Sequence, residues 1–370
     1  MNSLKIVIVS YTAYPSVAPR AQRTTELAKE MARQGHDVTM YVLKGDYDYT
    51  DFELKHNIKV KSLGRTFFLK FRHGNGTHYS IGTKIIKKLF GRVLEFPKIE
   101  LAYHVSKVLK NEKNIDLLVS IAVPYPIHWG VAWHKQRNPE KFKNITWVAD
   151  CGDPYMGNPF DSHPFYFKYI EKWFCRKADY ITIPIEEARD AYYPEFQHKI
   201  KVIPQGFNFD DIKVGNYQKN EVPTFIYAGV FYPELRDPRP LLDYLINLDR
   251  NFKFIIYTRT QTLIEKYKNL LEGKLFVYDY IPREELLVQM SKADFLLNIE
   301  NPSAKQSPSK LIDYALSQRP ILSIKSNDEF GKNVVDKFFE GDYSDSLKIE
   351  NIDQYDIKNI TAKFLKLVKN

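Results

Sequence analysis

The sequence has few cysteines and no long apolar run. Among its 370 residues only Cys151 and Cys175 are cysteines, and they match neither a metal-ligand spacing nor a C-x-x-C redox motif. This cysteine usage predicts a reducing compartment, the cytoplasm. No 18 consecutive residues are apolar, so a membrane-spanning helix is not expected. The apolar run at residues 6–9 is too short for a signal-peptide core and predicts a buried first strand.

Several common nucleotide and metal motifs are absent. The chain contains no G-x-G-x-x-G, no G-x-x-x-x-G-K-[ST] and no H-E-x-x-H, which disfavours a standard dinucleotide dehydrogenase, a P-loop enzyme and a zinc peptidase. Asp46-Tyr47-Asp48 matches the short D-x-D metal pattern, but it lies in a polar loop where such tripeptides arise by chance. We therefore assign no metal.

The net charge of +9 is consistent with nucleic acid, an anionic membrane surface or a phosphorylated small molecule as the partner. Part of this charge is concentrated at residues 65–98, where Glu95 is the single acidic residue. The basic residues of this segment are Arg65, Lys70, Arg72, Lys84, Lys87, Lys88, Arg92 and Lys98. With its phenylalanines, the segment fits a contact with an anionic membrane; a solvated flap is the alternative.

Alternating apolar runs and helical patterns predict an α/β protein. Short β-branched runs at residues 6–10 and 37–43 flank a helical pattern at 21–34, as in a parallel βαβ unit. The alternation restarts after a polar linker at 208–222. We therefore expect two doubly wound, Rossmann-like domains with parallel sheets, facing each other across a cleft.

The predicted domains are residues 1–207 and 222–350. A last helical pattern at 355–370 has no strand after it, and the sequence leaves open whether it caps the second domain or packs back on the first. Ligands of open parallel sheets bind at the carboxyl ends of the strands. The loops that follow strands are therefore where we expect the functional residues.

The most specific pattern is QSPSKLIDY at residues 306–314, directly after a predicted strand. Ser307 suits the N-cap of a helix, and Pro308 suits the first helical position. The free N–H groups and the positive dipole end of such a helix form an anion site. The alternative is an ordinary capped amphipathic helix.

Three further residues of this helix favour a nucleotide diphosphate. Ser309 and Lys310 add a hydroxyl and a cation for a pyrophosphate, and the carboxylate of Asp313 can accept hydrogen bonds from ribose hydroxyls. A second loop, after the strand at 224–228, contains Gly229, which allows close backbone approach, and Arg236, which can contact a phosphate. Arg236 in an ordinary surface ion pair is the alternative.

In the first domain, the strand at 146–150 leads into a loop with two carboxylates. Asp150 and Asp153 are candidates for holding an acceptor hydroxyl or acting as a base, and an ordinary Asp-Pro turn is the alternative. His128 is a candidate for contact with the transferred group, although a lone histidine more often belongs to the core.

Three stretches of the sequence resemble a known family. The stretch SPSKLIDYALSQRPIL, which begins at Ser307, resembles the P-S-K-[LF]-x-[ED]-Y-x-x-x-x-x-P signature of family 4 retaining glycosyltransferases with the GT-B fold. IKVIPQGFNFDD at 200–211 is similar to the segment that leads out of that family's first domain. FIYAGVFYPELRDPRPLL at 225–242 is similar to the opening strand and loop of its donor domain.

The resemblance implies transfer of a sugar, with retained configuration and without a metal or cofactor, from a nucleotide sugar to a hydroxyl. UDP-sugar is preferred over GDP-sugar as the donor. The implied acceptor is a glycan or a lipid-linked glycan in bacterial surface polysaccharide biosynthesis, at the inner face of the membrane.

The resemblance also implies roles for individual residues. Ser307, Ser309 and Lys310 would hold the pyrophosphate, Asp313 would take the place of the ribose-binding glutamate, and Arg236 stands where the family usually has a lysine. The chain departs from the family pattern at Val230, where a basic residue is common, and near Lys305, where a glutamate is common.

Two other functions remain open at this level. A sugar-nucleotide epimerase of related two-domain architecture would act on a nucleotide sugar without an acceptor. A non-enzymatic nucleotide- or nucleic-acid-binding protein would use the positive charge, but no nucleic-acid motif is present, so we expect no nucleic-acid partner.

Overall fold

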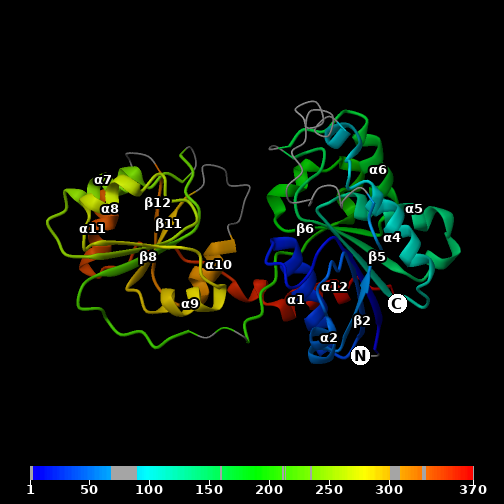
Figure 1. Ribbon diagram of the computed structural model, residues 1–370, viewed down its shortest axis with the longest axis horizontal. Coiled ribbons are helices and arrows are strands. Elements are labelled where there is room, and N and C mark those ends of the chain that lie inside the picture. The colour runs from blue at the N-terminus through cyan, green and yellow to red at the C-terminus, as the bar shows by residue number, and fades with distance from the viewer. Residues whose placement is uncertain are drawn as a thin grey trace. The chain divides into compact units, whose positions relative to one another are not determined.

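The structure of the protein, a computed structural model, consists of two units with one described sheet each. Unit 1 comprises Met1–Asn208 and Gln354–Asn370, and unit 2 comprises Phe209–Asp353. Within both units helices alternate with parallel strands (Figure 1). The structure describes residues 3–67, 90–158, 161–210, 212, 214–233, 236–300, 309–326 and 331–369. The prediction of an α/β protein with two doubly wound parallel sheets is confirmed.

The sheet of unit 1 has seven parallel strands among the described residues, in the order β3-β2-β1-β4-β5-β6-β7. Val7 of the central strand pairs with Thr39 on one side and with Leu118 on the other. The strand order therefore reverses between β1 and β4. The strands are β1 (Lys5–Ser10), β2 (Asp37–Val42), β3 (Ile58–Ser62), β4 (Leu117–Ala122), β5 (Thr146–Cys151), β6 (Tyr180–Ile183) and β7 (Ile200–Val202).

Helices cover both faces of this sheet, and each face has its own hydrophobic core. One core includes side chains of α1 (Pro19–Arg33), α2 (Thr50–His56) and α12 (Ile357–Leu365). The other includes side chains of α4 (Glu100–Lys110), α5 (Pro126–Arg137) and α6 (Phe167–Lys177). The short 3₁₀ helices are η2 (Glu140–Phe142), η3 (Glu186–Ala191), η4 (Pro194–Lys199) and η5 (Ile352–Tyr355).

Local sequence explains most of these elements. β1 is buried from Ile6 to Ser10, as expected for a central parallel strand covered on both faces. α1 begins with Pro19, whose fixed φ suits the first helical position, and ends before Gly35, which has a φ of +89°. β3 was not predicted, because only Ile58 and Val60 of this edge strand are buried.

The C-terminal helix α12 packs on unit 1. Ile360 and Phe364 are fully buried in the core that α1 also lines. The chain enters this helix beside the segment that leaves unit 1, because the N–H of Ile357 donates to the backbone oxygen of Phe207 at 2.8 Å. Asp356 caps the helix by accepting a 2.9 Å hydrogen bond from the backbone N–H of Lys358.

Unit 2 repeats the architecture with five parallel strands among its described residues, in the order β10-β9-β8-β11-β12. The strands are β8 (Thr224–Ala228), β9 (Lys253–Tyr257), β10 (Leu275–Tyr278), β11 (Phe295–Ile299) and β12 (Ile321–Ile324). One core includes α7 (Arg239–Ile246), α8 (Glu265–Leu270) and α11 (Lys332–Glu340), and the other includes α9 (Arg283–Ser291) and α10 (Ser309–Leu316).

Candidate functional site

The strand order of unit 2 reverses between β8 and β11, and such a switch point is where open parallel sheets bind ligands. Gly229 directly follows β8, and α10, the helix after β11, contains Lys310 and Asp313. The hydroxyl of Tyr314 accepts a 3.0 Å hydrogen bond from the N–H of Ala228, so α10 is joined to the end of β8. The structure therefore brings three of the predicted donor residues to one switch point.

Two cations, Lys310 and Arg236, lie near each other in this region, and neither has a carboxylate partner among the described residues. Lys310 Nζ is buried and has no hydrogen-bond partner among the described residues, and it lies 4.9 Å from the centre of the Tyr227 ring. Burial and the neighbouring charge of Arg236 lower the pKa of Lys310 to about 7. The Nε of Arg236 is also buried without a partner in the described part of the chain. An anionic ligand would offset both the repulsion between Lys310 and Arg236 and the cost of burying their charges.

Asp313 lies one turn along α10 and is held by Arg283, the first residue of α9. Nε and one terminal nitrogen of Arg283 both donate to Asp313 Oδ1, at 2.8 and 2.6 Å. Burial raises the pKa of Asp313, and the Arg283 guanidinium opposes this rise. Because Arg283 uses only Oδ1, the second carboxylate oxygen is left for a ligand hydroxyl. Arg283 was not among the residues predicted from the sequence, because no motif includes it.

Gly229 has a backbone conformation that favours glycine. Its φ is +148°, and a Cβ at this position would lie 3.3 Å from the hydroxyl oxygen of Tyr227. Its N–H donates to the backbone oxygen of Tyr257 at 3.0 Å, which ties the loop to β9. A side chain here would crowd the approach to the backbone at the end of β8.

Part of the predicted donor site lies outside the described residues. Ser307 and Lys305 are both outside the described residues. Ser309 is described only as the first residue of α10.

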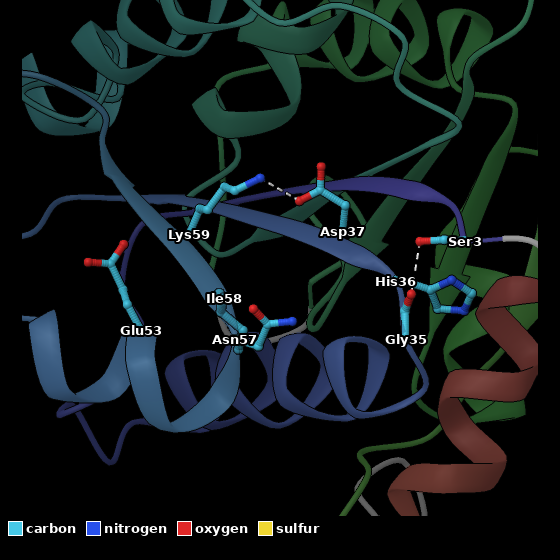
Figure 2. Close-up of a pocket in the computed structure, with 8 residues that line it drawn as sticks. All are labelled: Ser3, Gly35, His36, Asp37, Glu53, Asn57, Ile58 and Lys59. Carbon is cyan, nitrogen blue, oxygen red and sulfur yellow. Dashed lines mark hydrogen bonds and ion pairs between the residues drawn. The ribbon is translucent and has the colours of Figure 1, made fainter.

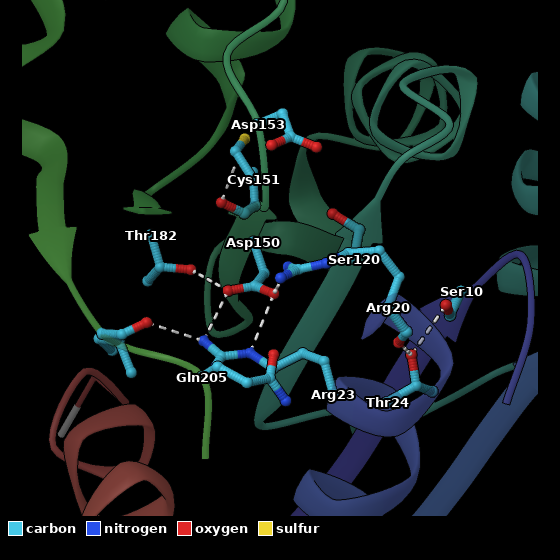
Figure 3. Close-up of polar contacts among 12 residues, drawn as sticks. Ser10, Arg20, Arg23, Thr24, Ser120, Asp150, Cys151, Asp153, Thr182 and Gln205 are labelled. Atoms are coloured by element: carbon cyan, nitrogen blue, oxygen red, sulfur yellow. Dashed lines mark hydrogen bonds and ion pairs between the residues drawn. The ribbon is translucent and has the colours of Figure 1, made fainter. Parts of the chain in front are cut away.

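In unit 1, Asp150 at the end of β5 is buried and fully engaged (Figure 3). Arg23 donates to both of its oxygens, at 3.2 and 2.9 Å, and Thr182 Oγ1 donates to Oδ1 at 2.7 Å. Arg20 Nη1 lies 3.5 Å from Oδ2. Burial acts to raise the pKa of Asp150, but the two arginines and the Arg23 and Thr182 hydrogen bonds hold it below its ordinary value. This carboxylate joins β5 to α1 and β6.

His128 on α5 is completely buried. Trp147 Nε1 donates to Ser120 Oγ at 2.8 Å, so the Ser120 hydroxyl can donate to His128 Nδ1, which is 2.8 Å away. His128 Nε2 lies 3.5 Å from the sulfur of Cys151. Burial lowers the pKa of His128 to about 3, so the imidazole is neutral near pH 7.

Asp153, three residues beyond Asp150, is exposed and lines a cavity of about 730 Å³. Figure 3 shows its carboxylate apart from the Asp150 contacts. The cavity opens where β4 and β5 end, since Val123 and Tyr155 also line it. Of the three acceptor candidates in unit 1, Asp153 is therefore the one whose side chain is open to a ligand.

A smaller pocket of about 260 Å³ lies at the opposite edge of the same sheet (Figure 2). It is lined by Asp37 and Ile58, the first residues of β2 and β3, and Lys59 closes one side through a 2.7 Å ion pair with Asp37. Amino ends of parallel strands are not where such sheets bind their ligands, so we assign this pocket no function.

The described residues contain neither a metal-binding cluster nor a membrane-spanning helix. No group of three or more His, Cys, Asp or Glu side chains in them could hold a metal ion. Asp48 of the D-x-D tripeptide instead accepts hydrogen bonds from the N–H and hydroxyl of Thr50, at 3.0 and 2.6 Å, at the start of α2. None of the described helices combines the length and the apolar character that crossing a membrane requires.

Solved structures show the same fold over nearly the whole chain. A glycosyltransferase from Rickettsia africae is 12% identical, with a TM-score of 0.62 over 99% of this chain and 98% of its own. Anabaena Alr3699/HepE, solved in complex with UDP and glucose, is 11% identical, with a TM-score of 0.61 over 98% of each chain. A putative UDP-N-acetylglucosamine 2-epimerase from Listeria monocytogenes is 10% identical, with a TM-score of 0.54 over 99% of this chain and 96% of its own. Among curated proteins, none matches.

The family follows from a match within the sequence. A model described as Glycosyltransferase Family 4 matches residues 21–211, just over half of the chain. The matched region runs from α1 through β7 and includes the Asp150 network and the Asp153 loop. The GT-B architecture of the solved glycosyltransferases agrees with this match. The chain therefore belongs to the glycosyltransferase family that this model describes.

Proposed function

We propose that this glycosyltransferase moves a hexosyl group from a nucleoside-diphosphate sugar to an acceptor hydroxyl with retention of configuration. The observation that carries the donor assignment is the pair of Lys310 and Arg236 at the switch point of unit 2. A diphosphate is the class of ligand that neutralises two such cations at the end of a parallel sheet. The UDP bound to Anabaena Alr3699/HepE supports a uridine nucleotide over GDP.

The donor residues would act mainly on the leaving diphosphate. As the glycosidic bond breaks, negative charge grows on the diphosphate, and the preorganised cations Lys310 and Arg236 stabilise it in a buried setting. Gly229 lets the diphosphate approach the backbone, and Ser307 and Ser309 supply hydroxyls. The free oxygen of Asp313 accepts from the ribose while Arg283 fixes the other oxygen.

In unit 1, we assign contact with the acceptor hydroxyl to Asp153, because its carboxylate is exposed beside the cavity. Asp150 and His128 act as positioning residues behind this loop. Asp150 holds the end of β5 through Arg23, and His128 holds Cys151, the last residue of that strand.

Calorimetric titration with UDP tests the donor site. Lys310→Met and Asp313→Asn should each raise the Kd of UDP about 10- to 100-fold, because loss of a charge-assisted contact costs about 1.5–3 kcal/mol. The matched control is Lys348→Met, which removes an exposed lysine of unit 2 and should leave the Kd unchanged. Equal UDP affinity in all three variants and the parent protein would refute the assignment.

An epimerase is the second candidate, because the Listeria structure shares the fold. Incubation with a UDP-sugar separates the two functions. A transferase forms a new glycoside only when an acceptor is present, and its retained anomeric configuration can be read from the proton coupling constant by NMR. An isomerised sugar nucleotide formed without an acceptor would favour the epimerase.

The finer biological role is also a proposal. We place the enzyme in the cytoplasm, at the inner face of an anionic membrane, acting on a glycan or lipid-linked acceptor of bacterial surface polysaccharide. Of the basic segment at 65–98, the structure describes 65–67 and 90–98, where Phe67 and Phe90 are exposed. Salt-sensitive co-sedimentation with anionic but not neutral vesicles, lost when Lys84, Lys87, Lys88 and Arg92 are changed to Ser, would support membrane contact.

A further inference from the structure

The 730 Å³ cavity of unit 1 has the features of a binding site of its own. Its walls come from the loops after β4 and β5, which contribute Tyr125 and Asp153, and from residues 91–98 and 161–163. Its volume lies in the range of small-molecule sites and accommodates more than one sugar ring. Its position at the carboxyl ends of β4 and β5 is the ligand-binding edge of an open parallel sheet.

One wall of this cavity is aromatic. His163 stacks on Tyr155, with ring centres 4.0 Å apart and an angle of 29° between the rings. Tyr155 is almost fully buried, and its hydroxyl donates to Glu95 Oε1 at 3.1 Å. Nδ1 of His163 lies 3.6 Å from the same oxygen. Because both contacts use Oε1, the lone pairs of Glu95 Oε2 are left for hydroxyl donors of a ligand.

The described lining residues include more carboxylates than permanent cations. The carboxylates are those of Glu95, Asp153 and Asp161, the permanent cations are Arg92 and Lys98, and His163 lies 3.6 Å from Glu95 and 3.8 Å from Asp161. The Asp153 carboxylate has no hydrogen bond or ion pair with any described residue, so it is available to a ligand. This is the reverse of the Lys310 region, where cations lack a carboxylate partner among the described residues. A phosphate here would meet three negative groups, whereas sugar hydroxyls can donate to carboxylates and accept from cations.

We infer that this cavity binds the acceptor as a neutral sugar, with Glu95 and Asp153 accepting its hydroxyl hydrogens and the Tyr155–His163 stack forming one wall. The inference rests on the proposed function and specifies the substrate class of its second site. The diphosphate of the donor and the neutral hydroxyls of the acceptor are thus assigned to sites of opposite charge character, one in each unit.

Saturation-transfer NMR of the full chain without donor tests this directly, with neutral methyl hexosides and methyl disaccharides compared with hexose phosphates. We expect saturation transfer to the neutral glycosides in preference to the phosphates. Glu95→Gln and Asp153→Asn should each weaken this binding about tenfold or more, since each removes a charged hydrogen-bond acceptor. Glu187→Gln is the matched control, because it makes the same change at an exposed glutamate of unit 1.

Preference for the phosphates, no binding of any neutral glycoside, or equal binding by all three variants would overturn the inference. Asp153→Asn keeps the test decisive if Glu95→Gln disturbs folding, because Asp153 is exposed. UDP titrations on the same samples separate this inference from the proposed function. If the protein binds glycosides but not UDP, only the donor-site proposal is contradicted. If it binds UDP but not glycosides, only the cavity proposal is contradicted.

Discussion

At the scale of single residues, Lys310 shows a conflict between stability and binding. Its pKa falls from 10.5 to about 7, so the unfolded chain binds this proton more tightly than the folded one. The resulting loss of stability is absent above pH 10.5, grows as the pH falls and is complete below about pH 7. A group that weakens the folded state and has no partner among the described residues is best explained by an anionic ligand.

Two measurements on Lys310 follow. At pH 8, UDP binding should take up roughly one proton, because the mostly neutral amine becomes an ammonium beside the diphosphate. Calorimetry in two buffers of different ionisation enthalpy measures this uptake. Lys310→Met should abolish the uptake and raise the free energy of unfolding at pH 7 by about 1–3 kcal/mol, whereas Lys348→Met should do neither. Proton uptake that persists in Lys310→Met would contradict this account.

Asp150 is the opposite case, a charge whose partners are all within unit 1. Asp150→Ala should lower the free energy of unfolding by about 3–5 kcal/mol, because it leaves Arg23 buried without its carboxylate. Denaturant titration measures the loss, with exposed Asp153→Ala as the control that should cost little. Since the change lies in unit 1, UDP affinity of the folded fraction should stay at the parent value. An unchanged free energy of unfolding in Asp150→Ala would show that Asp150 is not needed for folding and is again a candidate for binding the acceptor.

At the scale of elements, the last helix, α12, packs in the same hydrophobic core as the first strand, β1. Phe364 is fully buried among side chains of β1, β2 and α1, and Arg23 lies over its ring at 5.2 Å. Phe364→Ala should therefore lower the free energy of unfolding by about 3–5 kcal/mol. Phe165→Ala removes the same atoms from a side chain that is 72% exposed and should change stability little. Equal effects of the two changes in thermal unfolding would show that α12 does not pack as described.

The elements also show where local sequence suffices. β8 begins at residue 224 and ends at residue 228, as its apolar run predicts, because all five of its residues are buried and apolar composition marks such a strand. The edge strand β3 escaped prediction because Lys59 and Lys61 alternate with its two buried residues and mask the apolar signal. α10 is described from Ser309 onward, and the predicted N-cap Ser307 and first helical residue Pro308 lie outside the described residues.

At the scale of the whole molecule, each unit has its own pair of hydrophobic cores and should respond separately to its ligand. UDP at about 100 times its Kd should stabilise unit 2 by about 2.7 kcal/mol and leave unit 1 unchanged. Scanning calorimetry should therefore show two transitions, of which UDP raises one and Phe364→Ala lowers the other. A single transition that both treatments move would contradict this independence.

The sequence by itself determined the two rounds of alternating strands and helices, and it placed the candidate donor residues Gly229, Lys310 and Asp313 in loops or helices that follow strands. These features depend on hydrophobic period, turn residues and helix starts, which act over a few neighbouring positions. The family resemblance came from short stretches of the same kind. The family match at residues 21–211 supports a glycosyltransferase and includes one of these stretches, 200–211.

Only the tertiary structure decided which polar residues are already paired. In the sequence, Asp150 and His128 were candidates of the same kind as Asp153. In the structure, Asp150 is paired with Arg23, which is 127 positions away in the chain, and His128 is buried in the core. The packing of α12 on unit 1 was likewise open in the sequence. Such contacts join residues that are distant in the chain, so their energies depend on burial and distance in the folded state and leave no pattern in the local sequence.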